Sequence, residues 1–528
     1  MDPIGGDKPD IIQVDDRSLE RDRGDGEKGV RVRIIDDIRV LGLSDDDAIF
    51  YAGITEEKRK RIIHKVDIRL LPMLAILYLI SHLDRANIGN AKIEGLADNL
   101  GLSGVQWNIV LALFFIPYVL LEVPSNILLK RFARPSVYLG GLVIIWGIIM
   151  TLHGVCKNFA GLLTLRVLLG IFEAGFFPGA VYLCTFWYMP RQLAARIAYF
   201  YCTSALSGAF SGLLAAGIAK MDGVGGYEGW RWIFLLEGLT TILLGITCFF
   251  LLIDSPALSG KWLDPDEIRF LELQGFIKQG GKFADEAKEE DKFNWYDLKM
   301  VVLNWRLYLQ AYILMCISAC SYGTKFTLPS IVKGMGFTNT NAQLMTAPAF
   351  AAGAVSSIFF SRLSDRFQRR MPFVAIPLGL ITIGYAVIMS FKGNLTGSNV
   401  GPGYFALVLA CMGIYPVQPA GASWAANNIA PSRRRAIGVA FCICVGNAGG
   451  IIGSFMYLDE EAPTYYTGFG LSLAFGASGI VASVILELSY RWANARRDKI
   501  TEEEVRDKYT EDELMKLGDR SPLFRYTL

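Results

Sequence analysis

The feature that most limits how this chain can fold is a series of twelve apolar runs separated by short polar connections. A helix needs about 20 mostly apolar residues to cross the roughly 30 Å of hydrocarbon in a bilayer. Inside hydrocarbon every backbone polar group must find its partner within the protein, so each run is predicted to be a helix. The runs lie near residues 68–88, 105–129, 136–155, 160–188, 194–219, 231–253, 306–330, 341–363, 371–391, 403–425, 434–457 and 467–490.

Composition and charge also indicate a membrane protein. Of the 528 residues, 52% are hydrophobic and 19% are charged. The charges gather in residues 1–69, 254–299 and 491–528 instead of being spread along the chain as in soluble proteins. The net charge is +2 and no long basic tract is present, so we expect no nucleic-acid binding. The nine cysteines show neither CxxC nor Cys/His spacing, so no metal site is expected.

The basic residues predict the orientation of the helices. The segment EEKRKR precedes the first run and PSRRRA follows the tenth, whereas the alternate connections carry only isolated positive charges. Short loops rich in Lys and Arg stay in the cytoplasm. Both termini and the central loop are therefore expected there. The sequon that begins at Asn394 then lies outside, which makes Asn394 a candidate glycosylation site.

The runs divide into six, a polar interval, and six more. We therefore predict an all-α integral membrane protein with twelve transmembrane helices in two six-helix bundles. The expected parts are a disordered cytoplasmic tail over 1–66, a bundle over 67–253, a cytoplasmic central loop over 254–304, a bundle over 305–490 and a cytoplasmic tail over 491–528. This layout is typical of secondary transporters that rock two bundles around a site at the middle of the membrane.

The stretch RVLLGIFEAGFFPGA places Arg166 and Glu173 inside an apolar run. Seven residues make two helical turns, so the two side chains share a face but lie about 10 Å apart along the axis. They are too far apart for a direct ion pair, and each needs another partner. An ionisable residue inside a membrane is by default a functional hypothesis. We interpret Arg166 as a residue for anion binding or coupling, with a structural ion pair as the alternative, and Glu173 as the proton-linked carboxylate.

Other polar side chains in the runs are candidate site residues. Asp84 and Arg85 are adjacent, so they point in different directions on a helix. Arg85 is predicted to be a second ligand for a carboxylate, and Asp84 to pair across helices and take part in proton coupling; the alternative is a charge pair at the helix end. Lys325, in the seventh run, either binds substrate from the opposite bundle or snorkels to the surface. Asn447 hydrogen-bonds either substrate or another helix.

Matching basic loops follow the second and the eighth run, SNILLKRFARP and SRLSDRFQRR. Asp365 occurs only in the second of them. We interpret Asp365 and Arg366 as parts of a cytoplasmic gate, with the alternative that the positive charges only set the topology. Two other carboxylates in the runs are predicted to be structural. Glu122 is expected to pair within the first bundle, and Glu237 to tie the sixth run to a loop.

Four stretches taken together resemble one known family. They are LDRANIGNAKIEGL, RVLLGIFEAGFFPG, GWRWIFLLEG and SWAANNIAPSRRRAIGVAF. In order and spacing they are similar to the fungal anion:cation symporter branch of the major facilitator superfamily, which includes allantoate, nicotinate, pantothenate and biotin permeases. The resemblance covers about residues 60–490 and implies the twelve-helix major facilitator fold with proton-linked carriage of small organic acids.

The resemblance also bears on single residues. Arg166, Gly170 and Ala174 are similar to the fourth-helix RxxxGxxxA pattern of proton-coupled facilitators. The spacing of Arg166 and Glu173 is similar to that in vesicular glutamate and sialic acid carriers. Similar carriers also have an arginine at the position of Arg85, which favours a role for it in substrate binding.

The leading hypothesis is a transporter, and no enzyme, that imports a small organic anion with protons. The substrate would be a monocarboxylate such as a vitamin, or a nicotinate-like or allantoate-like compound. We expect no cofactor beyond the proton gradient, a monomer in the lipid bilayer, and the plasma membrane as its location, with a vacuolar or other internal membrane as the alternative. Aromatic residues are candidates to line the pocket: Tyr118, Phe177, Tyr182, Tyr322 and Trp424.

Two other hypotheses belong to different classes. A proton antiporter that exports a metabolite or drug would be expected to carry a GxxxGPxxGG-type element in the fifth run. That run reads SALSGAFSGLLAAGIA, with neither the proline nor the paired glycines. A nutrient sensor without transport would be expected to have long structured tails, whereas these tails look short and disordered.

Overall fold

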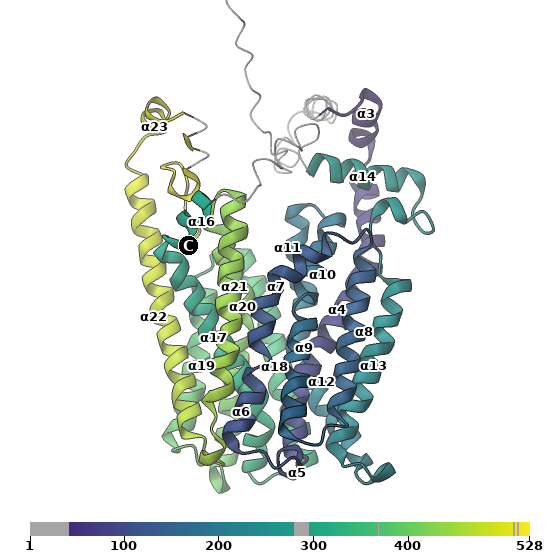
Figure 1. Cartoon of the computed structure of the whole chain (residues 1–528). Coiled ribbons are helices and arrows are strands. Elements are labelled where there is room, and N and C mark those ends of the chain that lie inside the picture. Colours follow the sequence, from purple (N-terminus) through teal and green to yellow (C-terminus); the bar gives the residue numbers. More distant parts are fainter. Residues whose placement is uncertain (1–41, 279–294, 368, 511–512, 515–516) are drawn as a thin grey trace, which may run out of the picture. The chain divides into compact units, whose positions relative to one another are not determined.

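The structure is a computed structural model that describes residues 42–278, 295–367, 369–510, 513–514 and 517–528. In this part of the chain the regular elements are helices, and no strand occurs (Figure 1). The helices in the first part are α3 (Asp45–Gly53), α4 (Glu56–Ile93), α5 (Leu96–Asn99), α6 (Gly104–Ala112), α7 (Phe115–Leu129), α8 (Pro135–His153), α9 (Phe159–Glu173), α10 (Phe176–Trp187), α11 (Pro190–Tyr201), α12 (Thr203–Ile218) and α13 (Gly229–Leu251). They are followed by α14 (Pro265–Lys278), α16 (Trp295–Val302), α17 (Trp305–Gly334), α18 (Asn339–Phe367), α19 (Pro372–Ser390), α20 (Val400–Asn427), α21 (Ser432–Met456), α22 (Tyr466–Arg497) and α23 (Glu502–Lys508).

The membrane-length helices agree closely with the apolar runs. Among the described residues, eleven helices are long and apolar enough to span a bilayer. A twelfth span results if α16 and α17, which meet at a bend of 68°, are counted as one. The predicted all-α membrane architecture is thereby confirmed. We refer to α4–α13 as the N-terminal half and to α17–α22 as the C-terminal half.

Local sequence signals set several helix ends. Ser103 and Gln106 form a reciprocal capping box at the start of α6. The Asn158 side chain accepts a hydrogen bond of 2.8 Å from the backbone N–H of Gly161 and caps α9. Pro135 opens α8, where its missing N–H costs nothing. The polar connections therefore act as helix starts as well as loops.

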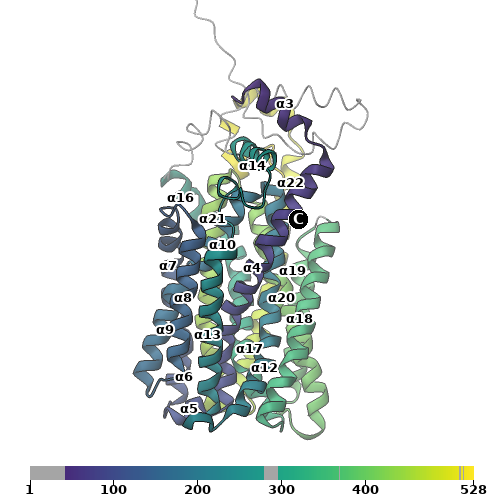
Figure 2. The same cartoon turned by 90° about the vertical axis from the view of Figure 1, so that its right-hand side faces the viewer.

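The helices are organised in two compact units. The first consists of residues 1–72, 181–196 and 252–293, and the second of residues 73–180, 197–251 and 294–528. Within the second unit the long helices run side by side, as the two views in Figures 1 and 2 show. The second unit contains most of the length of the membrane-spanning helices and the candidate site residues described below.

In the first unit, α14 is fastened to its neighbours by ion pairs. Arg269 of α14 lies 2.6 Å from a carboxylate oxygen of Asp47 in α3. The Ser44 hydroxyl, which caps α3, and Arg269 together lower the pKa of Asp47. Lys65 of α4 lies 2.7 Å from Glu267 of α14. Polar side chains of the central loop therefore pack on the N-terminal segment.

These contacts correct our expectation that residues 1–66 form a disordered tail. Residues 45–53 and 56–66 are helical, and each helix has a partner of opposite charge on α14, since Asp47 pairs with Arg269 and Lys65 pairs with Glu267. Residues 1–41 lie outside the described part of the chain.

The end of the chain is also more ordered than expected. The Asn428 side chain donates to the carbonyl of Thr527 at 3.0 Å and accepts from its N–H at 2.7 Å. Asn494 makes the same pair of bonds with Tyr526, both at 2.9 Å. Each asparagine satisfies the donor and the acceptor of one backbone unit, as a neighbouring strand would. We predicted a disordered tail, and no sequence pattern indicated that Asn428 and Asn494 would bind its backbone.

The nine cysteines are all free. Seven are buried and two are partly buried. The buried ones are Cys156, Cys184, Cys248, Cys316, Cys320, Cys411 and Cys442, and the partly buried ones are Cys202 and Cys444. They occupy the places of small apolar residues in the helix packing.

Glycines allow α8 and α13 to approach closely. A Cβ atom on Gly147 of α8 would lie 2.9 Å from the backbone nitrogen of Ile242 and 3.1 Å from the carbonyl oxygen of Gly238, both in α13. In contrast, a Cβ on Gly141 of the same helix would meet nothing within 4 Å. Small residues at such positions permit tight packing between membrane helices.

We expect Gly147→Val to lower stability and Gly141→Ala to leave it unchanged or slightly raised. Overpacking a tight contact costs about 1–3 kcal/mol, whereas replacing a helical glycine in open space removes a conformational cost. The measurement is the thermal unfolding midpoint of the detergent-purified protein. Equal midpoints for the two variants would contradict the close contact between α8 and α13.

Candidate functional site

A buried ion pair joins α4 to α9. The Nε atom of Arg85 lies 2.7 Å from Oε1 of Glu173, and the Ser81 hydroxyl donates to the same oxygen. Arg85 is 4% exposed and Glu173 is 1% exposed. Glu173 thus finds its partner on another helix, as its distance from Arg166 required. A buried pair of this kind needs further hydrogen bonds to offset the loss of water, and Ser81 supplies one of them.

Arg85 also reaches the C-terminal half. Its Nη1 atom donates to the hydroxyl of Tyr322 on α17 at 3.1 Å. Its guanidinium group lies 4.5 Å from the ring centroid of Tyr118 and 5.1 Å from that of Phe114. Aromatic faces attract a desolvated cation. Arg85 is therefore held by a carboxylate, a hydroxyl and two rings, and it connects helices from both halves of the chain.

Asp84 faces a different set of partners. Its Oδ2 atom accepts hydrogen bonds of 3.2 Å from Nε1 of Trp146 on α8 and from Oγ1 of Thr241 on α13. It therefore makes contacts across helices, though with neutral donors. Arg166, 2% exposed, interacts electrostatically with Asp84 and Glu173. Two of its nitrogens, Nε and Nη2, have no hydrogen-bond partner among the described residues.

Lys325 lies inside the protein and does not snorkel to the surface. It is 4% exposed, and its Nζ atom is 3.2 Å from the hydroxyl of Ser207 on α12 and 3.4 Å from Nδ1 of His82 on α4. Within the described residues no carboxylate forms a salt bridge with it. Lys325 is a buried basic side chain from the C-terminal half that faces neutral polar groups of the N-terminal half.

Asn447 has a protein partner. Its Nδ2 atom donates to Oε2 of Glu122 at 3.3 Å, which links α21 to α7. Glu122 therefore bonds across the two halves and not, as we expected, within the N-terminal half. Glu237 is buried on α13, and neither of its carboxylate oxygens has a hydrogen-bond partner in the described chain.

The predicted gate and glycosylation residues lie away from these contacts. The Asp365 side chain is outside the described part of the structure. Arg366 is exposed in the last turn of α18. Asn394 is exposed between α19 and α20, where its Oδ1 atom accepts from the Thr396 backbone at 3.2 Å. The roles of these residues stay predictions.

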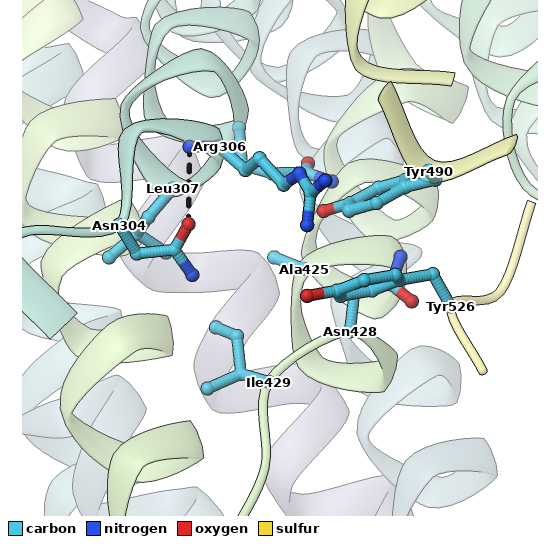
Figure 3. Close-up of a pocket in the computed structure, with 9 residues that line it drawn as sticks. Asn304, Arg306, Leu307, Ala425, Asn428, Ile429, Tyr490 and Tyr526 are labelled. Atoms are coloured by element: carbon cyan, nitrogen blue, oxygen red, sulfur yellow. Dashed lines mark hydrogen bonds between the residues drawn. The ribbon is translucent and has the colours of Figure 1, made fainter. Parts of the chain in front are cut away.

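A small pocket in the C-terminal half contains none of the predicted site residues. It lies between the start of α17, the end of α20, α22 and the last residues of the chain. Figure 3 shows the Arg306 guanidinium group beside the rings of Tyr490 and Tyr526, whose centroids are 5.4 and 4.7 Å away. Trp424, expected in the substrate pocket, is buried near this pocket and donates to Thr527.

Sequence reasoning missed Ser81 as a partner of Glu173 and Ser207 as a partner of Lys325. Ser81 precedes Arg85 by one helical turn, so the spacing alone predicts that both side chains lie on the same face of α4. Ser207 lies in a small-residue run, and nothing in that run distinguishes it from its neighbours. No group of His, Cys, Asp and Glu side chains within the described chain could hold a metal ion.

Comparison with known proteins identifies the class. Residues 74–454 match the Major Facilitator Superfamily, and the chain belongs to this family of membrane transporters. A bacterial homologue of the human lysosomal transporter Spinster, solved in an inward-facing and occupied conformation, has the same fold. It superimposes with a TM-score of 0.59 at 18% identity and covers 80% of this chain and 96% of its own. The predicted fold is thereby confirmed, and the protein is a transporter, not an enzyme.

Fungal relatives are similar over nearly the whole length. The MFS-type transporter cnsO of Penicillium expansum is 36% identical over 480 residues, which cover 89% of this chain and 91% of the relative. The high-affinity nicotinic acid transporter of Saccharomyces cerevisiae is 30% identical over 486 residues, which cover 92% of this chain and 87% of the relative. These comparisons confirm the resemblance to fungal permeases.

We expect loss of one member of the Arg85–Glu173 pair to destabilise the protein more than loss of both. Breaking a buried pair leaves an uncompensated charge and costs about 3–5 kcal/mol, whereas replacing both partners with apolar residues can be nearly neutral. The measurement is the thermal unfolding midpoint of Arg85→Leu, Glu173→Leu and the double variant. A double variant less stable than both single variants would contradict the pairing.

Proposed function

We propose that the protein imports a small organic anion, a monocarboxylate, together with protons by alternating access. The observation that supports this most is the Arg85–Glu173 ion pair, buried at a place where Arg85 also contacts Tyr322 of the other half. The geometry favours a site at which a substrate carboxylate and an internal carboxylate share one guanidinium group.

The competition for Arg85 provides a coupling mechanism. While Glu173 is ionised, its carboxylate occupies the Nε side of Arg85 at 2.7 Å. A proton on Glu173 removes that charge, and the planar guanidinium can then bind a substrate carboxylate through two parallel hydrogen bonds. Loss of the proton restores the internal pair and displaces the anion. Binding of the anion and of the proton are therefore linked through one arginine.

Two further buried basic side chains favour an anionic substrate. Lys325 has only neutral partners among the described residues, and Arg166 has two nitrogens without a hydrogen bond there. Burying a basic side chain whose hydrogen bonds are incompletely satisfied costs free energy, even where, as for Arg166, carboxylates interact with it electrostatically. A bound anion near Arg85 and Lys325 would offset this cost, and the two residues come from different halves of the chain.

Contacts between the halves support alternating access. At the end of α4, Lys92 pairs with Asp459, which lies between α21 and α22. Nearby, Gln343 of α18 donates to Glu94 at 3.0 Å, and Lys333 of α17 donates to the carbonyl of Ile93 at 3.3 Å. These polar contacts join the halves at one end of the helices and can be exchanged for water when the halves separate.

The yeast nicotinic acid transporter among the relatives supports a small carboxylate as the substrate. We propose the plasma membrane as the location, a monomer as the active form, and the proton gradient as the energy source with no further cofactor. A competition screen of monocarboxylates against pH-dependent uptake, in cells that lack related permeases, tests the proposed function. Uptake of no monocarboxylate by cells that display the protein would overturn it.

We expect Arg85→Lys and Arg166→Lys to reduce uptake by about tenfold or more while the protein still reaches the membrane. Lysine keeps the charge but loses the planar fork that binds a carboxylate. A hydrogen bond between charged groups contributes about 1.5–3 kcal/mol, which sets the size of the effect. Arg491→Lys, in a half-exposed pair on α22, is the matched control and should retain uptake. Uptake at the wild-type rate in both site variants would refute the carboxylate clamp.

Glu173→Gln should separate substrate exchange from accumulation. The amide cannot take up and release the proton, so the variant is expected to exchange labelled for unlabelled anion but not to accumulate it along a pH gradient. Both activities are measured with the same purified protein in liposomes, with and without an imposed gradient. If accumulation persists, another group carries the proton.

A further inference from the structure

Glu122 and Asn447 form a contact that the proposed function does not use. Glu122 is 8% exposed on α7, in the N-terminal half, and its Oε2 atom lies 3.3 Å from Nδ2 of Asn447 on α21, in the C-terminal half. A buried carboxylate costs free energy unless it is paired or protonated. Among the described residues its hydrogen-bond donor is a neutral amide, so this contact compensates the charge incompletely.

The position of Glu122 ties it to Arg85. Tyr118 precedes Glu122 by one helical turn, and the Tyr118 ring is the one that lies 4.5 Å from the Arg85 guanidinium group. Arg85 also attracts Glu122 electrostatically. Arg85 therefore has two carboxylates within electrostatic reach, since it binds Glu173 directly.

The other elements around Glu122 bring few titratable groups. From α21 it faces Asn447 and interacts with the thiol of Cys444. From α9, which packs against α7, comes Glu173, already bound to Arg85. Helix α6, which also packs against α7, has no titratable side chain in its sequence GVQWNIVLA. Helix α9 also carries Arg166, which interacts with Glu173 and Asp84. Among these groups Arg85 is the cation that interacts with Glu122.

A substrate anion on Arg85 would change this balance. It would neutralise the guanidinium charge and bring a second negative charge close to Glu122. Like charges at short distance favour uptake of a proton by one of them. Once protonated, Glu122 still accepts the hydrogen bond from Asn447, so the contact between the halves persists in both charge states.

We propose that Glu122 is a second proton-coupling carboxylate, which takes up a proton when an anion binds Arg85 and expels the anion when it loses that proton. This inference rests on the proposed function. In this proposal Asn447 is the hydrogen-bond partner of Glu122 at the interface of the halves, and the titration of Glu122 does not require it. It also predicts that anion affinity depends on two protonation events, at Glu173 and at Glu122.

The decisive variant is Glu122→Gln, which retains an acceptor for Asn447 and removes the charge. Because the variant imitates the protonated state, KM for the anion at about pH 7.5 should fall by about threefold to tenfold, the effect of removing one nearby negative charge. In the wild type we expect KM to rise with pH. In the variant this rise should be smaller by up to about tenfold per pH unit, the contribution of one titrating proton. The maximal rate should fall, because release is no longer assisted.

Two control variants separate titration from structure. Asn447→Leu removes the hydrogen bond but leaves the carboxylate, so the dependence of KM on pH should remain steep even if the protein is less stable. Glu487→Gln replaces another buried glutamate, paired with Arg491 on its own helix α22, and should leave the pH profile unchanged. If Asn447→Leu flattens the profile as much as Glu122→Gln does, Glu122 has only a structural role.

A second measurement needs no substrate, so it tests the titration of Glu122 even in a variant that has lost uptake. Infrared difference spectra of the purified full chain in liposomes, between about pH 5 and pH 8, detect carboxylic acid groups that titrate in this range. We expect a band that disappears in Glu122→Gln and persists in Glu173→Gln. An unchanged band in Glu122→Gln, or an unchanged slope of KM with pH, would overturn this inference. Failure of the wild type to carry any monocarboxylate would instead overturn the proposed function.

Discussion

A charge placed in the low-dielectric interior of a membrane protein must be compensated locally, and much of the arrangement of these helices follows from that requirement. Arg85 is compensated from several directions at once, by Glu173 of α9, Tyr322 of α17 and the Tyr118 ring of α7. One guanidinium group thereby fixes the relative positions of four helices. A movement that separated α4 from α17 would break the hydrogen bond between Arg85 and Tyr322.

The packing of the helices around this charged centre depends on other interactions. Membrane helices gain little from burying apolar side chains against each other, so close backbone approach and interhelical hydrogen bonds take over. Gly147 lets α8 approach α13, the helix whose Thr241 donates to Asp84. The tight packing and the polar contact thus support each other. A residue far from Arg85 can for this reason affect the charged centre through the position of a whole helix.

The fold was largely predictable because each span carries its own signal. The expected run 136–155 became α8 (Pro135–His153), and 434–457 became α21 (Ser432–Met456), since about 20 apolar residues suffice to mark a helix. The partners inside the site were not predictable in the same way. Spacing showed that Glu173 could not pair with Arg166, but the choice of Arg85 depends on how α4 and α9 are rotated against each other. The hydrogen bond between Glu122 and Asn447 joins residues 325 positions apart. The apolar runs mark each helix separately and do not show which residues of two helices face each other.

The placement of the cysteines has a practical consequence for experiments on this transporter. Seven of the nine thiols are buried and the other two are only partly accessible. A membrane-impermeant maleimide should therefore find little to react with on the unaltered chain. A single new cysteine at an exposed position such as Lys392 would stand out against this low background. The natural sequence can thus serve as the parent for site-directed labelling, and the side of the membrane on which each connection lies can be mapped without first replacing the native thiols.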